Sequence, residues 1–104
     1  MEKYMGMYRE FGFQDAPSMR DSFETVAYEG QTKVAAYLRN GDPGVACPKT
    51  EKDVFTGEYI KDECIVRFDG VFKWPMSLAY YVERYHLRLP LEFEQHILRN
   101  TAKA

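Results

Sequence analysis

The sequence contains few of the residues on which metal centres and disulfide frameworks depend. Its 104 residues include two cysteines, Cys47 and Cys64, and two histidines, His86 and His96. None of the four stands in a paired spacing such as C-x-x-C or H-x-x-x-H, which structural zinc sites use to place two ligands on one turn. We therefore expect no metal and no other cofactor. So few cysteines fit a reducing compartment with free thiols. A single disulfide between Cys47 and Cys64 is the alternative.

Long apolar runs and an excess of one charge sign are also missing. No stretch approaches the roughly 20 apolar residues that span a bilayer. The first residues, MEKYMGMYREFGF, are interrupted by Lys3, Arg9 and Glu10, unlike the apolar segment of a signal peptide. The formal net charge is −2 with acids and bases mixed, so a general affinity for nucleic-acid backbones has no support. These absences predict a cytoplasmic protein without a membrane partner.

Motifs of catalysis are sparse. The turn-rich NGDPG of residues 40–44 lacks the Gly-Lys-Ser/Thr ending of a P-loop, and there is no G-x-S-x-G elbow. Cys47, in the loop-like VACPK, is a better candidate nucleophile than Cys64, which lies in the apolar alternation of ECIVRF. Four acids could supply a carboxylate pair, although solvated turn acids are commoner: Asp53, Asp62, Glu63 and Asp69. The pattern favours a protein that is not an enzyme.

The residues that are present predict one α+β domain. The chain is 45% apolar, 29% charged and 15% aromatic, which is typical of a single globular domain over residues 1–104. We expect an irregular N-terminus over about 1–17 and a frayed tail over about 100–104. Residues 31–40 have helical periodicity and end at a Gly41 cap signal, after which Pro43 favours a loop.

Residues 45–74 favour strands. DVFTGEYI, residues 53–60, carries the β-branched and aromatic types that suit a pleated surface. ECIVRF, then Asp69-Gly70, then VFKW predicts a hairpin with a two-residue type I′ turn in which Phe68 faces Val71. The expected sheet is therefore small and mostly antiparallel, and it includes the 63–68 and 71–74 hairpin.

Two Pro-started helices are expected after the hairpin, over 76–86 and 90–99. The first has an apolar stripe at helical spacing, Leu78, Tyr81, Val82 and Tyr85. In the second, three polar residues are expected to face outward, Glu92, Glu94 and Gln95. With the helix over 31–40, about three helices cover the sheet, two of them C-terminal. Trp74 is expected to anchor the core, with its indole N–H bonded to a nearby carbonyl.

Tyr80 and Arg84 are the candidate binding residues, because they lie opposite the apolar stripe and because Tyr and Arg often anchor interfaces. They favour a small non-catalytic module that binds another protein, such as an immunity or regulatory partner. A small enzyme or ligand-binding domain is the alternative. A nucleic-acid-binding regulator is a second one, since Tyr80, Tyr81, Arg84, Tyr85 and Arg88 interleave rings with cations. Nearby glutamates make that reading less favoured.

Three segments carry a resemblance to a family. They are VAAYLRNG at 34–41, DVFTGEYI at 53–60 and DGVFKWPMSLAYYVERYHLRLPLEF at 69–93. Together they resemble a group of small uncharacterised bacterial proteins with a YL-x-x-G helix end, a DG-x-x-x-W hairpin and an LAYYV-x-x-Y-x-x-x-LP-x-x-F segment. The resemblance covers about the C-terminal two-thirds of the chain. It implies a recurring order of helix, strands, hairpin and two helices, and no catalytic residue.

Overall fold

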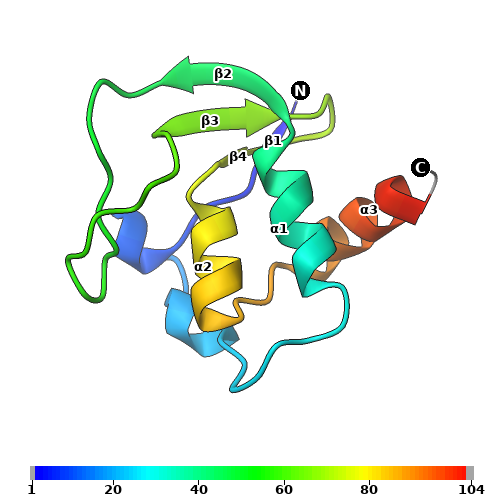
Figure 1. The fold of residues 1–104 in the computed structure, drawn as a ribbon, viewed down its shortest axis with the longest axis horizontal. Coiled ribbons are helices and arrows are strands. Elements are labelled where there is room, and N and C mark those ends of the chain that lie inside the picture. Colours follow the sequence, from blue (N-terminus) through cyan, green and yellow to red (C-terminus); the bar gives the residue numbers. More distant parts are fainter. Residues whose placement is uncertain (1, 103–104) are drawn as a thin grey trace.

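A computed structural model of the chain describes residues 2–102 and combines a four-stranded sheet with three α-helices (Figure 1). The elements follow in the order β1 (Lys3–Tyr4), the 3-10 helices η1 (Arg9–Phe11) and η2 (Met19–Ser22), α1 (Gln31–Arg39), β2 (Asp42–Ala46), β3 (Ile65–Phe68), β4 (Phe72–Pro75), α2 (Leu78–Tyr85) and α3 (Leu91–Ala102). None of these helices is both long and apolar enough to cross a bilayer. The irregular N-terminus holds only β1 and η1 before residue 17.

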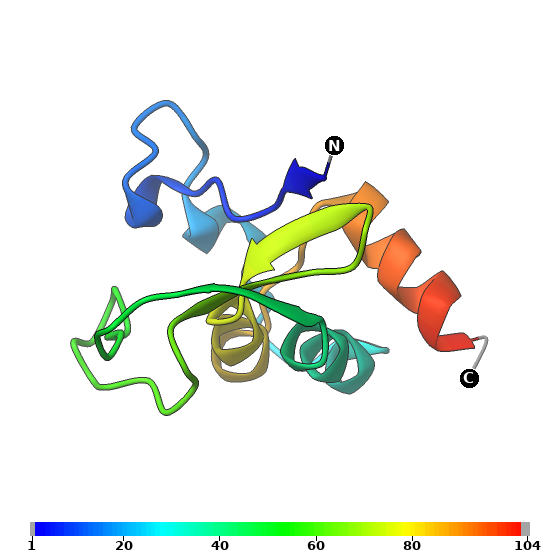
Figure 2. The ribbon, with the colours of Figure 1, turned by 90° about the horizontal axis from the view of Figure 1, so that it is seen from above.

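The strands lie in the order β1-β4-β3-β2. β3 pairs antiparallel with both β2 and β4, whereas β1 runs parallel to β4. The predicted α+β class and the three helices are therefore confirmed, and the sheet is mixed because of β1. In Figure 2 the N-terminal segment lies on the opposite side of the sheet from α1 and α2, while α3 lies beside the end of the sheet near β1.

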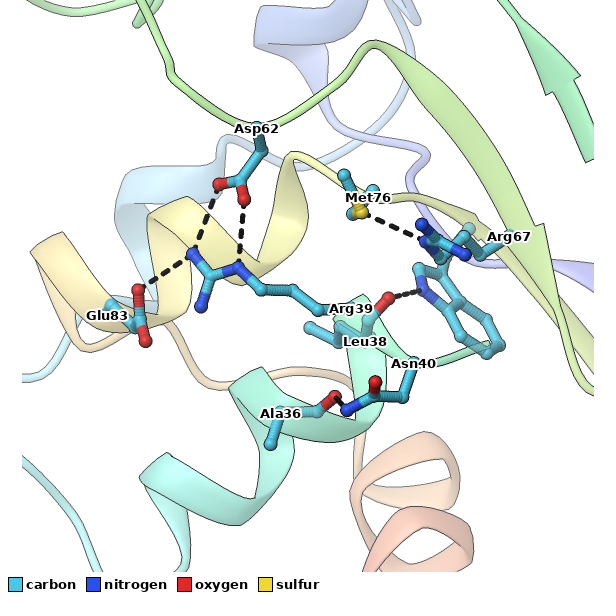
Figure 3. A network of polar contacts seen from close by, with 9 residues as sticks. Ala36, Leu38, Arg39, Asn40, Asp62, Arg67, Met76 and Glu83 are labelled. Carbon is cyan, nitrogen blue, oxygen red and sulfur yellow. Dashed lines mark hydrogen bonds and ion pairs between the residues drawn. The ribbon is translucent and has the colours of Figure 1, made fainter. Parts of the chain in front are cut away.

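The core fills the space between the sheet and the helices. Its largest fully buried side chains are Trp74, Tyr81 and Phe93. The indole of Trp74 donates a hydrogen bond of 2.9 Å to the carbonyl oxygen of Leu38 at the end of α1, which confirms the expected donor (Figure 3). Gly41 must be a glycine here, because a Cβ at this position would lie 2.7 Å from Cζ2 of Trp74. The end of α1 is thus fitted directly against β4.

The hairpin forms, but its predicted register is wrong by two residues. Phe68 pairs with Lys73 instead of Val71. The turn centres on Gly70 and Val71, and only Gly70 has a positive φ, of 92°, whereas a type I′ turn needs two such residues. The Asp69 carboxylate accepts hydrogen bonds from the N–H groups of Val71 and Phe72 and so holds this turn. A slip of two residues preserves the alternation of faces, so each residue of the hairpin stays on the same side of the sheet as in the predicted register.

Two expectations about strands are wrong. Residues 53–60 form a loop closed by an isolated bridge between Lys52 and Tyr59, because the Asp53 carboxylate binds two N–H groups of the loop itself. Residues 42–44, expected as a loop, belong to β2 (Asp42–Ala46) at the edge of the sheet, where the missing N–H of Pro43 needs no partner. A register shift between Pro43 and Ala46 interrupts the pairing with β3.

The C-terminal helices differ from expectation at their ends. Pro75 is the last residue of β4, and α2 begins only at Leu78. α3 continues to Ala102, so residues 100–102 are helical instead of frayed, and residues 103–104 lie outside the described chain. Glu94 is buried instead of exposed, because its carboxylate accepts hydrogen bonds from the Arg88 guanidinium and from the N–H of Leu89.

Candidate functional site

The structure brings Tyr80 and Arg84 together on α2, against the loop of residues 52–59. The Tyr80 hydroxyl donates to Oδ2 of Asp53 over 2.6 Å. Arg84 donates from Nη1 to the Tyr80 hydroxyl and pairs through Nη2 with Glu58, at 3.0 and 2.9 Å. Both predicted residues therefore hold this loop onto α2, and Arg84 remains partly exposed.

Asp53 is the centre of this arrangement. It is only 2% exposed, and it accepts hydrogen bonds from the hydroxyls of Tyr80 and Tyr85, each 2.6 Å long, and from the N–H groups of Phe55 and Thr56. Burial opposes ionisation, but these four donors outweigh it and hold the pKa of Asp53 below its usual value. For Tyr85, burial and the neighbouring carboxylate raise the pKa of the hydroxyl. Asp53 therefore carries a negative charge that the hydroxyls of two neutral tyrosines stabilise by hydrogen bonding.

A surface of rings lies beside this buried carboxylate. We call it the arginine–aromatic surface and define it by four residues that line a shallow hollow of 310 Å³, Arg20, Phe23, Phe55 and Tyr85. Phe23 stacks on Tyr85 with centroids 4.8 Å apart, and Phe55 meets Tyr85 edge-on at 5.3 Å. The Arg20 guanidinium carbon lies 4.7 Å from the centroid of Phe55. The three rings are half-buried, so each presents an edge or face to solvent.

The segment before α1 positions two members of this surface. Ser18 caps η2 by accepting a hydrogen bond from the N–H of Arg20. Phe23 forms a bridge with Leu87 just after α2, and the N–H of Arg88 donates to Ser22 over 2.7 Å. These backbone contacts tie residues 18–23 to the end of α2. Sequence reasoning missed Arg20 and Phe23 because their partners lie far along the chain.

A second polar cluster joins α1, the hairpin turn and α3. Asp69 accepts at Oδ2 from the Tyr37 hydroxyl and from Nε2 of His96, the latter at 2.7 Å. Asn100 donates to the Tyr37 hydroxyl. Burial opposes the charge of Asp69, but four hydrogen bonds hold its pKa below its usual value. Burial and the hydrogen bond to Asp69 raise the pKa of Tyr37 to about 12. The sequence gives no sign of this cluster, because its members come from three distant elements.

An Asp–His pair of this kind orients the general base in hydrolases. Here Nε2 of His96 donates to Asp69, and the Asn100 amide nitrogen lies 3.0 Å from the same Nε2. Neither Asp69 nor Asn100 is a nucleophile. Asp69 also holds the hairpin turn through its other oxygen. The cluster therefore has the chemistry of a structural lock between the turn and α3.

The remaining candidate groups have separate partners. Asp62 pairs with Arg39, which also bonds to Glu83, at 2.9 and 2.8 Å (Figure 3). Asp53, Asp62 and Asp69 thus each serve a different contact. Cys47 and Cys64 are free, with Cys47 exposed and Cys64 buried. In the described part of the chain, no group of three or more His, Cys, Asp or Glu side chains is arranged to hold a metal ion.

The chain was compared with family models, curated protein sequences and solved structures. No family model, curated protein sequence or solved structure matches the chain. The resemblance of residues 34–41, 53–60 and 69–93 to small bacterial proteins therefore stays a prediction.

Proposed function

We propose that the chain is a small non-catalytic module that binds another protein through its arginine–aromatic surface. The observation that carries this proposal is the hollow of 310 Å³ that Arg20, Phe23, Phe55 and Tyr85 line. Aromatic residues and arginine are enriched at the centres of protein interfaces, where they supply most of the binding free energy. The candidate residues Tyr80 and Arg84 border the same surface through their contacts with Asp53 and Tyr85.

The rings are fixed before any partner arrives. Tyr85 is held by its hydrogen bond to Asp53 and by stacking on Phe23, and Phe55 follows the loop that Asp53 closes. A partner that covers these rings therefore restricts few side chains that were free. Preorganisation of this kind lowers the entropic cost of association.

The charge at the surface favours an acidic segment as the occupant. Arg84 is paired with Glu58, whereas Arg20 forms no ion pair within residues 2–102 and lies over Phe55. A carboxylate of the partner can pair with Arg20 while a neighbouring apolar side chain enters the hollow.

We place this interaction in the cytoplasm, where both cysteines stay reduced, and in an immunity or regulatory role.

The test compares three versions of the full chain as baits in cells of the native source. They are the parent, Arg20→Gln, and Arg99→Gln, which removes an exposed arginine on α3 as a matched control. A partner retained by the parent and by Arg99→Gln, but lost by Arg20→Gln, supports the proposal. The purified partner should then bind Arg20→Gln about tenfold more weakly, as loss of an interface ion pair predicts.

Two results would contradict the proposal. One is a set of captured proteins that is the same for Arg20→Gln and for the parent. The other is capture of no partner together with turnover of a small metabolite by the purified chain. Phe55→Ser gives an independent check, because it removes a ring from the hollow but leaves Arg20 and Arg84 in place. This variant should also lose the partner.

A further inference from the structure

Cys47 and Cys64 lie opposite each other where β2 ends and β3 begins. The two strands pair antiparallel with Ala46 opposite Ile65, so the next pair in this register is Cys47 and Cys64. The N–H of Cys47 donates a hydrogen bond of 2.7 Å to the carbonyl oxygen of Cys64, so the pairing extends to the cysteines. Both residues line one hollow of 350 Å³. Their side chains therefore lie on the same side of the sheet.

This placement fits the geometry of a disulfide. Residues directly opposite each other in an antiparallel pair have Cα atoms about 4.5 to 5.5 Å apart. A disulfide joins residues whose Cα atoms are about 4.4 to 6.8 Å apart. The thiols are also within reach of each other, because a hydrogen bond with Cys47 is, after burial, a cause of the raised pKa of Cys64. A bond between the two sulfurs therefore requires little movement of the backbone.

The two thiols differ in their access to solvent. Cys47 is exposed, so a small oxidant in solution can reach its sulfur. Cys64 is only 8% exposed, and burial is the main reason why its pKa is raised to about 12, so it stays protonated at pH 7. Redox-sensing sites commonly place an accessible cysteine next to a second cysteine that resolves its oxidised form. Cys47 is thus the thiol that meets the oxidant, and Cys64 is the resolving thiol.

We propose that Cys47 and Cys64 form a reversible redox site, at which hydrogen peroxide converts the two thiols into an intramolecular disulfide. First, the Cys47 thiolate attacks one oxygen of the peroxide. An S–O bond forms, the O–O bond breaks, and the released hydroxide takes up the proton of the Cys47 thiol as water. Cys47 is then a sulfenic acid.

The second step forms the disulfide. The Cys64 sulfur attacks the sulfur of the sulfenic acid, the S–S bond forms, and the S–O bond breaks. The hydroxyl group leaves as water with the proton of the Cys64 thiol. In total the two thiols lose two electrons and the peroxide gains them, which yields two waters. A dithiol reverses the reaction by thiol–disulfide exchange.

The disulfide would join the two ends of the segment between β2 and β3. Residues 48–63 contain no helix and no strand of the sheet. A disulfide that closes such a loop restricts the unfolded chain, so the oxidised form should melt about 5 to 10 °C higher than the reduced form. In a reducing cytoplasm the pair rests as thiols, and disulfides that form there are usually transient. The proposal concerns these two thiols alone and does not depend on a protein partner.

The test treats the reduced full chain with hydrogen peroxide and follows its mass. The product should be a monomer lighter by two hydrogen atoms, and digestion without reduction should yield a peptide pair linked through Cys47 and Cys64. Dithiothreitol should restore both thiols. Dimedone, which traps sulfenic acids, should label Cys47 in the Cys64→Ser variant. It should label the parent at least about tenfold less, because the neighbouring thiol reacts first.

A variant with a displaced thiol is the matched control. Cys47→Ser combined with Val45→Cys moves the exposed thiol two positions along the chain, away from the residue opposite Cys64. This variant keeps Cys64 in place, and it should be labelled by dimedone and form at least about tenfold less intramolecular disulfide than the parent.

Four results would overturn the proposal. The parent could stop at an oxidised Cys47 without a disulfide, or it could link only to a second copy of the chain. Its disulfide could resist dithiothreitol, or the displaced thiol could form the disulfide as readily as the parent. An oxidised chain that melts at or below the temperature of the reduced chain would contradict the closure of residues 48–63.

Discussion

Replacement of Asp53 by asparagine tests the contact that joins α2 to the loop of residues 52–59. Oδ1 of Asp53 accepts the N–H groups of Phe55 and Thr56, and an asparagine can keep these bonds. Oδ2 accepts the hydroxyls of Tyr80 and Tyr85, and an amide nitrogen in its place cannot accept them. The substitution therefore removes two hydrogen bonds to a charged oxygen and almost no volume.

The expected cost follows from those two bonds. A hydrogen bond to a charged group contributes about 1.5 to 3 kcal/mol, and Asp53 is 2% exposed, so its own charge is poorly solvated. Tyr80 and Tyr85 are half-buried, so water can satisfy their hydroxyls in part. We expect Asp53→Asn to lower the free energy of unfolding by about 2 to 4 kcal/mol. Tyr80→Phe and Tyr85→Phe should each cost less, about 1 to 2 kcal/mol.

The pH dependence gives a second measurement. The pKa of Asp53 is lower in the folded chain than its ordinary value, so its ionised form contributes stability above about pH 4, and the contribution is lost as the pH falls through the folded pKa. The deficit of Asp53→Asn should thus be largest at neutral pH and shrink in acid. Urea unfolding followed by the fluorescence of the single tryptophan measures both quantities. Asp15→Asn, at an exposed aspartate, is the control.

A loss below about 1 kcal/mol at pH 7 would refute this reasoning, since it is less than one hydrogen bond to a charged group. A deficit that stays the same from pH 7 to pH 3 would also refute it, because the charge of Asp53 would then have no part in the effect.

Three further predictions concern the core and the thiols. Trp74→Ala should cost about 3 to 5 kcal/mol in urea unfolding, because the indole is fully buried, and a variant that melts like the parent would contradict its role as a core anchor. Gly41→Ala should cost about 1 to 3 kcal/mol, because its Cβ would lie 2.7 Å from the indole; an unchanged midpoint would show that the indole moves freely. In the native chain, iodoacetamide should modify Cys47 and leave Cys64, whose pKa is about 12; equal labelling by mass spectrometry would contradict this.

Local patterns were sufficient where the deciding contacts are close in sequence. Helical spacing predicted an apolar stripe of four residues, of which Leu78, Tyr81 and Val82 are buried and Tyr85 is half-buried. Trp74 was expected to anchor the core beside the hairpin, and it is fully buried even though the turn slipped. The slip itself arises from the Asp69 side chain, whose hydrogen bonds select the turn.

Long-range contacts explain what local patterns missed. The strand-like composition of residues 53–60 gave no sign that Asp53 would bind tyrosines 27 and 32 positions away. Glu94 was expected to face solvent, because the sequence does not show that Arg88 pairs with its carboxylate. A hollow of 350 Å³ is lined by residues from distant segments, among them Tyr4, Cys47 and Ser77, so no single stretch of sequence predicts it.

The parallel pairing of β1 with β4 has a consequence for the order of assembly. Residues 3 and 4 are synthesised first, yet they can dock only after residues 72–75 have left the ribosome, because Lys3 pairs with Phe72. Closing so long a loop is slow and is rewarded only by contacts that the rest of the sheet must already provide. We therefore expect β1 to join the sheet only after β4 has formed.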